Sequence, residues 1–299
     1  MNLPLDWDRD GHDWPHRAAS AFVQAGGIRW HVQQMGEGPV LLMIHGTGAS
    51  THSWRSLMPL LAPHFRCVAF DLPGHAFTGM PPAMQLSLPG MARAVAALIA
   101  RLEIAPQWVL GHSAGAAIGA WLCLHERLAP AALIAVNGAF MPLPGLAGLV
   151  FPPVARVMAA TPWAARVFAW RAADQETVRR LIADTGSVLD ARGIALYARL
   201  VRNPVHADAA LGMMARWNLV PLLRALPRLV PALHLLAGER DRAVAPAQSQ
   251  EIARRVPGAR CTLIADAGHL AHEEVPSACA AAVLAVRAGR SARTTRTAA

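Results

Sequence analysis

Residues 109–117, VLGHSAGAA, decide the fold of this chain of 299 residues. A short apolar run leads to Gly111, and the pattern Gly-x-Ser-x-Gly then passes through Ser113 into segment 114–128, which has helical periodicity. A strand that turns sharply into a helix at a serine forms a nucleophile elbow, with the hydroxyl held clear of the sheet. The bare pattern is equally compatible with a small residue in a tight turn, so the rest of the chain must decide.

A serine nucleophile needs a base, and the base needs an acid that orients it. Asp241 follows the apolar run 232–238, and His269 follows the apolar run 261–266. The chain order Ser, Asp, His is the one that a nucleophile elbow requires. All three residues come just after predicted strands, at the carboxyl edge of a parallel sheet, where open α/β sheets hold their sites. We therefore predict that Ser113, Asp241 and His269 form a catalytic triad.

Other residues compete for two of these roles. Asp241 has an alternative in a surface ion pair with Arg240 or Arg242. Asp266 is a competing acid, but it lies so close in sequence to the predicted base that it is expected to cap a loop or helix. His272 is a competing base, but it is expected inside the last helix.

Acyl transfer also needs hydrogen-bond donors for the oxyanion. The apolar run 39–45 ends in the sequence HGTG, where glycine lets the main chain approach a ligand closely. The backbone N–H groups of Thr47 and Ala114 are predicted to form the oxyanion hole, with Gly48 as a substitute for Thr47. The residues expected to line the site by packing and by orienting loops are His45, Gly46, Gly48 and His112.

Strand and helix patterns alternate along most of the chain. The alternation predicts an α/β fold whose eight-stranded sheet is mostly parallel and carries helices on both faces. It stops after the sixth strand, so the expected core comprises residues 20–138 and 227–288, and residues 139–226 form an inserted helical cap. Residues 1–19 are an N-terminal extension, and the basic tail 289–299 is predicted to be disordered.

The composition excludes several classes of protein. Hydrophobic residues make up 54% of the chain and charged residues 16%, which excludes general disorder. The net charge is +9 without a single Lys, so Schiff-base chemistry is excluded. The arginines are scattered before the tail, so no nucleic-acid partner is expected. No cluster of residues has metal-ligand spacing, and neither a metal nor a cofactor is expected.

Neither a membrane span nor a signal peptide is predicted. Segment 128–155 has no charged residue, but its five prolines would repeatedly break a helix, so it is interpreted as a buried strand followed by part of the cap. The start of the chain is polar and acidic, unlike a signal peptide. A cytoplasmic location is therefore expected, and peripheral association with the inner membrane is left open.

The motifs HGTG, DLPGH, GHSAG, GERD and GH-x-x-x-E-E-V-P resemble those of the α/β-hydrolase superfamily over residues 20–288. The resemblance implies an α/β-hydrolase fold. The serine at the elbow argues against the branches that use an aspartate nucleophile, the haloalkane dehalogenases and epoxide hydrolases.

The N-terminal half, together with DLPGHAFT, is similar to the magnesium chelatase accessory protein family of bacteriochlorophyll biosynthesis. Ala76 departs from that pattern, because glycine usually follows the histidine of DLPGH. The resemblance implies a role in the magnesium branch of tetrapyrrole synthesis, in photosynthesis, but it does not imply a known reaction.

The cap is rich in aromatic residues and methionine, which either pack over the elbow or form a pocket for a large, flat, apolar ligand. A tetrapyrrole has this shape and carries propionate groups. The candidate ligand contacts are Trp163, Phe168 and Trp170 for stacking and Arg156, Arg166 or Arg171 for the propionates.

The sequence thus favours a Ser–His–Asp hydrolase that acts on ester or related acyl bonds of a hydrophobic substrate, a tetrapyrrole or its ester. One alternative is a non-catalytic module on the same fold that binds a tetrapyrrole or docks on magnesium chelatase. A general carboxylesterase, or a hydrolase of ring-cleavage products, would share every motif.

Overall fold

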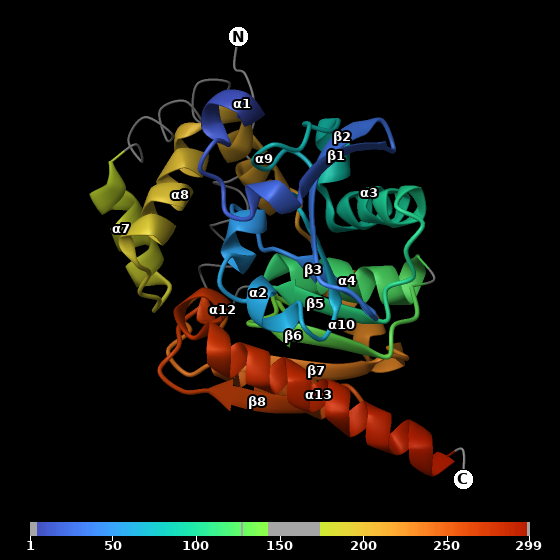
Figure 1. Cartoon of the computed structure of the whole chain (residues 1–299). Helices are drawn as coiled ribbons and strands as arrows, with labels where there is room; N and C mark the ends of the chain where they lie inside the picture. The colour runs from blue at the N-terminus through green and yellow to red at the C-terminus, as the bar shows by residue number, and fades with distance from the viewer. Residues whose placement is uncertain (1–4, 127, 143–173, 298–299) are drawn as a thin grey trace.

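A computed structural model describes residues 5–126, 128–142 and 174–297 (Figure 1). Within these residues eight strands form one sheet in the order β1-β2-β4-β3-β5-β6-β7-β8. β2 runs antiparallel to β1 and β4, and every other neighbouring pair is parallel. The strands are β1 (Ser20–Ala25), β2 (Ile28–Met35), β3 (Val40–Ile44), β4 (Arg66–Phe70), β5 (Trp108–His112), β6 (Ala132–Val136), β7 (Ala232–Gly238) and β8 (Arg260–Ile264). The mostly parallel sheet predicted from the sequence is confirmed.

The helices follow from the same alternating pattern. The α-helices are α1 (Trp7–Asp10), α2 (Met58–Leu61), α3 (Leu88–Arg101), α4 (Ala114–His125), α7 (Gln175–Asp184), α8 (Ala191–Arg202), α9 (Pro204–Ala215), α10 (Val220–Ala225), α11 (Pro246–Arg255), α12 (Ala271–Glu274) and α13 (Pro276–Thr297). Four 3-10 helices are described, η1 (Arg17–Ala19), η2 (Thr51–Trp54), η3 (Ala83–Leu86) and η4 (Leu226–Arg228).

The central strands have no solvent-facing side, which explains why they read as continuous apolar runs. Leu42 and Ile44 of β3 pack in the apolar core beneath α3 and α4. Leu41 and Met43 of the same strand pack in a second core, beneath α2 and α13. Helices therefore cover both faces of the sheet, as predicted, and the carboxyl ends of the strands remain as the edge where loops can gather.

Between β6 and β7 the chain leaves the sheet and forms α7, α8, α9 and α10. This is where the sequence predicted the helical cap, although part of the predicted cap lies outside the described residues. In Figure 1, α7 and α8 lie to one side of the sheet, with α1 next to α8. None of the described helices combines the length and hydropathy that a bilayer-spanning helix requires.

The N-terminal extension is bound to both the core and the cap. The indole N–H of Trp14 donates to the hydroxyl of Thr51, 3.1 Å away, in the loop after β3. The guanidinium of Arg199, in α8, contacts the carboxylate of Asp13 at 2.6 Å. Apolar packing of Trp14 against Phe77 and Leu200 completes this contact, so the extension connects α8 to the core.

The last helix, α13, runs from Pro276 to Thr297. The disorder expected for the basic tail 289–299 stays a prediction.

Candidate active site

Ser113 occupies a strained turn between β5 and α4. Its backbone has φ 49° and ψ −118°, which non-glycine residues rarely adopt. A Cβ atom on Gly111 would overlap the backbone of Ala116, and one on Gly115 would overlap the carbonyl oxygen of Ile44. The two glycines of the Gly-x-Ser-x-Gly pattern are therefore required by close backbone packing, and the strand–turn–helix context of a nucleophile elbow is present.

Ser113, His269 and Asp241 come together in a chain of hydrogen bonds. The hydroxyl oxygen of Ser113 lies 3.1 Å from Nε2 of His269. Nδ1 of His269 lies 2.8 Å from Oδ2 of Asp241. An ionised carboxylate only accepts hydrogen bonds, so Nδ1 carries the proton and Nε2 is left to accept the serine proton. The side chain of His269 is 11% exposed, whereas the carboxylate of Asp241 is fully buried.

Asp241 is fixed in place by the loop after β7. Its Oδ1 accepts hydrogen bonds from the backbone N–H groups of Ala243 and Val244, both 2.8 Å away. These bonds leave Oδ2 directed at the imidazole. Of the competing residues, Arg240 lies 3.9 Å from Asp266, and Asp266 is exposed.

Asn137 was not singled out by the sequence analysis, yet it links two strand ends to the histidine loop. Its side-chain oxygen accepts from the N–H of Gly238 at 2.7 Å. Its amide nitrogen donates to the carbonyl oxygens of Gly268 at 2.9 Å and His269 at 2.8 Å. Asn137 also has a positive φ of 48°, which asparagine tolerates better than most residues. The only sequence signal was an asparagine that ends an apolar run.

Two buried histidines lie behind His269. Nε2 of His112 donates to the carbonyl oxygen of His269 at 2.9 Å. Burial lowers the pKa of His112 well below its usual value, so the ring is neutral at pH 7. His272 was expected inside the last helix, but it lies in the short helix α12 that precedes α13, with its ring centroid 4.3 Å from that of His112. Burial lowers the pKa of His272 to about 3, and His269 alone of the three imidazoles lies within hydrogen-bond distance of Ser113 in the described structure.

The loop after β3 lies against Ser113. A Cβ atom on Gly46 would come 3.1 Å from the Cβ of Ser113. His45 holds this loop, because its Nδ1 donates to the carbonyl oxygen of Gly46 and its Nε2 accepts from the N–H of Leu72, both at 2.8 Å. Burial lowers the pKa of His45, which keeps the ring neutral and able to accept.

The predicted oxyanion donors lie in this loop and at the start of α4. Neither the N–H of Thr47 nor that of Ala114 has an acceptor within the described part of the chain. Gly48 has a positive φ of 75°, and its carbonyl oxygen accepts from Nε2 of His206, in α9, at 3.1 Å. The hydroxyl of Thr47 points to the sulfur of Met213, 3.4 Å away in the same helix. The cap therefore directly contacts the loop after β3, which holds the predicted oxyanion donor Thr47.

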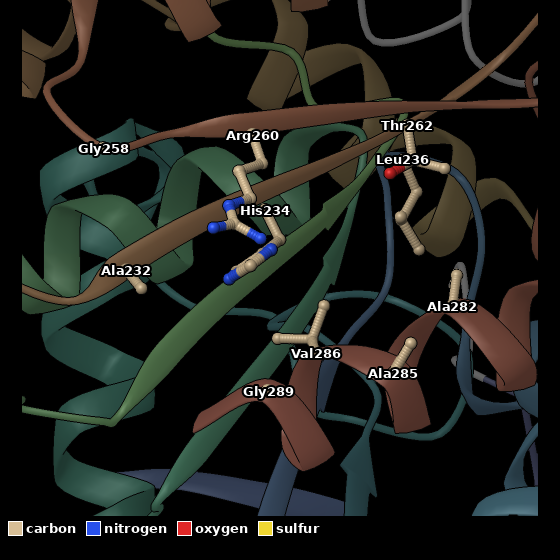
Figure 2. A pocket seen from close by; sticks show the side chains of 10 residues that line it. All are labelled: Ala232, His234, Leu236, Gly258, Arg260, Thr262, Ala282, Ala285, Val286 and Gly289. Atoms are coloured by element: carbon tan, nitrogen blue, oxygen red, sulfur yellow. The ribbon is translucent and has the colours of Figure 1, made fainter. Parts of the chain in front are cut away.

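The candidate ligand contacts predicted in the cap, Trp163, Phe168, Trp170 and Arg171, lie outside the described residues, as do Arg156 and Arg166. A cavity of about 270 Å³ lies instead between β7, β8 and α13 (Figure 2). Arg260 and His234 extend into it from neighbouring strands. It lies toward the beginnings of β7 and β8, whereas Asp241 and His269 follow their ends, so this cavity is not the candidate active site.

A second serine, histidine and aspartate are hydrogen-bonded under the N-terminal extension. The hydroxyl oxygen of Ser20 lies 3.0 Å from Nε2 of His31. Nδ1 of His31 lies 2.8 Å from Oδ2 of Asp71, and both of these side chains are fully buried. No sequence motif marks this group, since the three residues lie on β1, β2 and the end of β4 without a Gly-x-Ser-x-Gly turn.

A family model described as the alpha/beta hydrolase family matches residues 41–282. With the sheet order and the elbow described above, the chain belongs to the α/β hydrolase family. A magnesium-chelatase 30 kDa subunit from Rhodobacter capsulatus is 41% identical over 263 residues, which cover 87% of this chain and 92% of that protein. Both resemblances that the sequence motifs suggested are thus confirmed.

Two further matches extend the comparison. A pimeloyl-(acyl-carrier protein) methyl ester esterase from Aeromonas hydrophila is 28% identical over 247 residues, covering 80% of this chain and 91% of that enzyme. The crystal structure of an alpha/beta hydrolase fold protein from Burkholderia ambifaria has a TM-score of 0.76 at 25% identity, covering 95% of this chain and 99% of that one. The match extends over almost the whole of both chains.

Proposed function

We propose that this protein is a serine hydrolase that cleaves an ester or related acyl bond in a hydrophobic substrate. The observation that carries the proposal is the hydrogen bond between the hydroxyl of Ser113, in its strained turn, and the imidazole of His269. The methyl ester esterase among the relatives supports ester chemistry on the same fold.

In the proposed reaction, His269 takes the proton from Ser113 as the serine oxygen bonds to the carbonyl carbon of the substrate. The N–H groups of Thr47 and Ala114 donate to the oxygen that becomes negative, and Asp241 stabilises the imidazolium without taking its proton. The imidazolium then gives its proton to the leaving alcohol. Water, activated by the same imidazole, releases the acid from the acyl-enzyme.

The relative that is a magnesium-chelatase subunit supports a substrate class. We propose that the acyl bond belongs to a tetrapyrrole or its ester and that magnesium chelatase is a partner. This part of the proposal is tested by titrating the protein with magnesium protoporphyrin and following the quenching of tryptophan fluorescence. Saturable quenching that a phosphonate on Ser113 abolishes would support it, and quenching that ignores the phosphonate would contradict it.

The same relative favours a second candidate, a non-catalytic module that binds a tetrapyrrole or docks on the chelatase. The two candidates differ in whether Ser113 is activated. Binding alone needs neither an oriented imidazole nor free N–H groups beside a serine.

A fluorophosphonate probe separates the two candidates. We expect it to label the wild-type protein and to fail on Ser113→Ala. Ser20→Ala is the matched control, because it removes a serine hydroxyl that also contacts Nε2 of a histidine, and it should label like the wild type. A wild-type protein that stays unlabelled at Ser113 would rule out the hydrolase and leave the binding module.

A further inference from the structure

The segment that follows α7 runs between the loops that carry Asp241 and His269. The carbonyl oxygen of Thr185 accepts hydrogen bonds from the backbone N–H groups of Arg242, at 3.1 Å, and His269, at 3.4 Å. One peptide group of the cap therefore contacts the acid loop and the base loop together.

Three consecutive N–H groups around His269 donate to acceptors from outside their own loop. That of Gly268 donates to Oε1 of Glu274 at 2.9 Å, and that of His269 donates to Thr185. The N–H of Leu270 donates to the hydroxyl oxygen of Ser187 at 2.8 Å. Ser187 is 1% exposed, so loss of its hydroxyl would leave the N–H of Leu270 buried without an acceptor, which costs free energy.

The contact between the segment and the loops is made by bare backbone. Gly186 has a positive φ of 85°, and a Cβ atom on it would overlap the carbonyl oxygen of Arg240. A Cβ atom on Gly268 would overlap the backbone of Gly186. Because no side chain separates the segment from the loops that carry Asp241 and His269, a shift of the segment must move both loops.

Two further contacts hold the segment in register. Glu274 accepts from the N–H of Val188 at 3.0 Å with the oxygen that does not contact Gly268. Leu270 packs in one apolar cluster with Leu189 of the cap and Ala49 of the loop after β3. The same segment is thus connected to the residues before and after His269.

We propose that Ser187 is a positioning residue for His269, and that residues 185–188 make the cap a structural part of the catalytic centre. This inference rests on the proposed function, because the position of His269 affects turnover only where His269 acts as the base. The hydroxyl of Ser187 fixes the backbone of Leu270, and through it the distance from the imidazole to Ser113.

Ser187→Ala tests the proposal in the full-length protein with a short-chain aryl ester. Loss of the hydroxyl leaves the N–H of Leu270 without an acceptor and lets the imidazole shift, so kcat should fall about 10-fold to 100-fold. KM should change less than about twofold, because the substitution removes no substrate contact. Ser249→Ala, a similarly buried serine in α11, is the matched control and should keep the wild-type kcat.

A second readout is independent of turnover. The Nδ1 proton of His269, held by Asp241, should give a downfield proton resonance in the resting protein, assigned by its loss in His269→Ala. The ring proton that His31 donates to Asp71 gives an internal reference. Ser187→Ala should broaden or shift the His269 resonance and leave that of His31 unchanged.

Glu274→Gln provides an independent variant where Ser187→Ala folds poorly. Its amide group can accept only through one atom, so either Gly268 or Val188 loses its acceptor, and the same resonance should move. Unchanged resonances and unchanged phosphonate labelling rates in the folded variants would overturn the proposal. If wild-type Ser113 does not react at all, the proposed function fails, while the His269 resonance still reports whether Ser187 positions the ring.

Discussion

Two serines of this protein contact similar pairs of side chains. The hydroxyl oxygen of Ser113 lies 3.1 Å from Nε2 of His269, and that of Ser20 lies 3.0 Å from Nε2 of His31. In both pairs, Nδ1 of the histidine lies 2.8 Å from an aspartate oxygen. Around the two serines the structure differs. Ser113 has the strained backbone of the elbow and lies beside the N-terminus of α4. Ser20 begins an ordinary strand with φ −89° and ψ 140°, and its oxygen also accepts from Nε2 of Gln33 at 3.1 Å.

The histidines differ in access as well. The side chain of His269 is partly exposed, whereas that of His31 is fully buried, with the ring of Trp7 tilted against it at a centroid distance of 4.8 Å. Asp71 serves the fold, because it also accepts from the N–H groups of Thr51 and Phe77. Similar hydrogen bonds therefore occur in two settings, which differ in the backbone strain of the serine and in the exposure of the histidine.

The largest expected effect comes from removing each histidine. His269→Ala should lower kcat for an ester by roughly 10⁴ or more, because Ser113 then has no base. The measurement is steady-state turnover of an aryl ester, with burst titration to count active molecules.

His31→Ala should act on stability instead. It removes the imidazole partner of the buried Asp71 carboxylate, which keeps only hydrogen bonds from backbone N–H groups, and should lower the free energy of unfolding by about 3–5 kcal/mol. Urea unfolding would measure this cost, and the folded fraction should retain its kcat. A loss of kcat in His31→Ala without loss of stability would remove the distinction between the two groups.

The second prediction compares two acids near His269. Asp241→Asn should lower kcat by roughly 10⁴, because an amide can hold the wrong tautomer of the imidazole. Asp266→Asn should change kcat by less than about twofold, since Asp266 is exposed and contacts Arg240. The reverse order of effects in steady-state assays would show that the acid is assigned wrongly.

The fold could be predicted, and the three candidate triad residues could be selected, because local sequence signals mark them. Apolar runs give the strands, and Gly111, Ser113 and Gly115 are demanded by one tight turn. The roles of Asn137 and Ser187 could not be predicted, because they depend on which loops meet in space. Likewise, no local signal shows that His31 and Asp71, 40 residues apart, share a hydrogen bond.

The motif GH-x-x-x-E-E-V-P was recognised as a family resemblance, but the contacts of Glu274 with the histidine loop and the cap required the structure.

The third prediction concerns the backbone N–H donors predicted beside Ser113. Thr47→Pro removes one N–H group from the predicted oxyanion hole and should lower kcat about 10²-fold to 10³-fold. Thr47→Ala is the matched control, because it removes the side chain and keeps the N–H, and it should stay within about fivefold of the wild type. Equal losses of kcat in the two variants, with circular dichroism spectra like that of the wild type, would show that the N–H of Thr47 is not the donor. The N–H of Gly48 would then be the next candidate.

The smallest effect concerns the stability that Asp71 contributes. Burial raises its pKa, but the charge and hydrogen bond of His31, His45 and the N–H of Thr51 together lower it to about 2, from an ordinary 3.8. A carboxyl group whose pKa is lower in the folded state stabilises the fold above its unfolded pKa, and this stability is lost as the pH falls through the folded value. The loss between about pH 5 and about pH 2 should be about 2 kcal/mol. Urea unfolding of the wild type and Asp71→Asn at both ends of this range measures it, with Asp266→Asn as the control for net charge. The difference in unfolding free energy between the wild type and Asp71→Asn should shrink toward low pH. A constant difference would mean that the packing of Asp71, and not its charge, stabilises the fold.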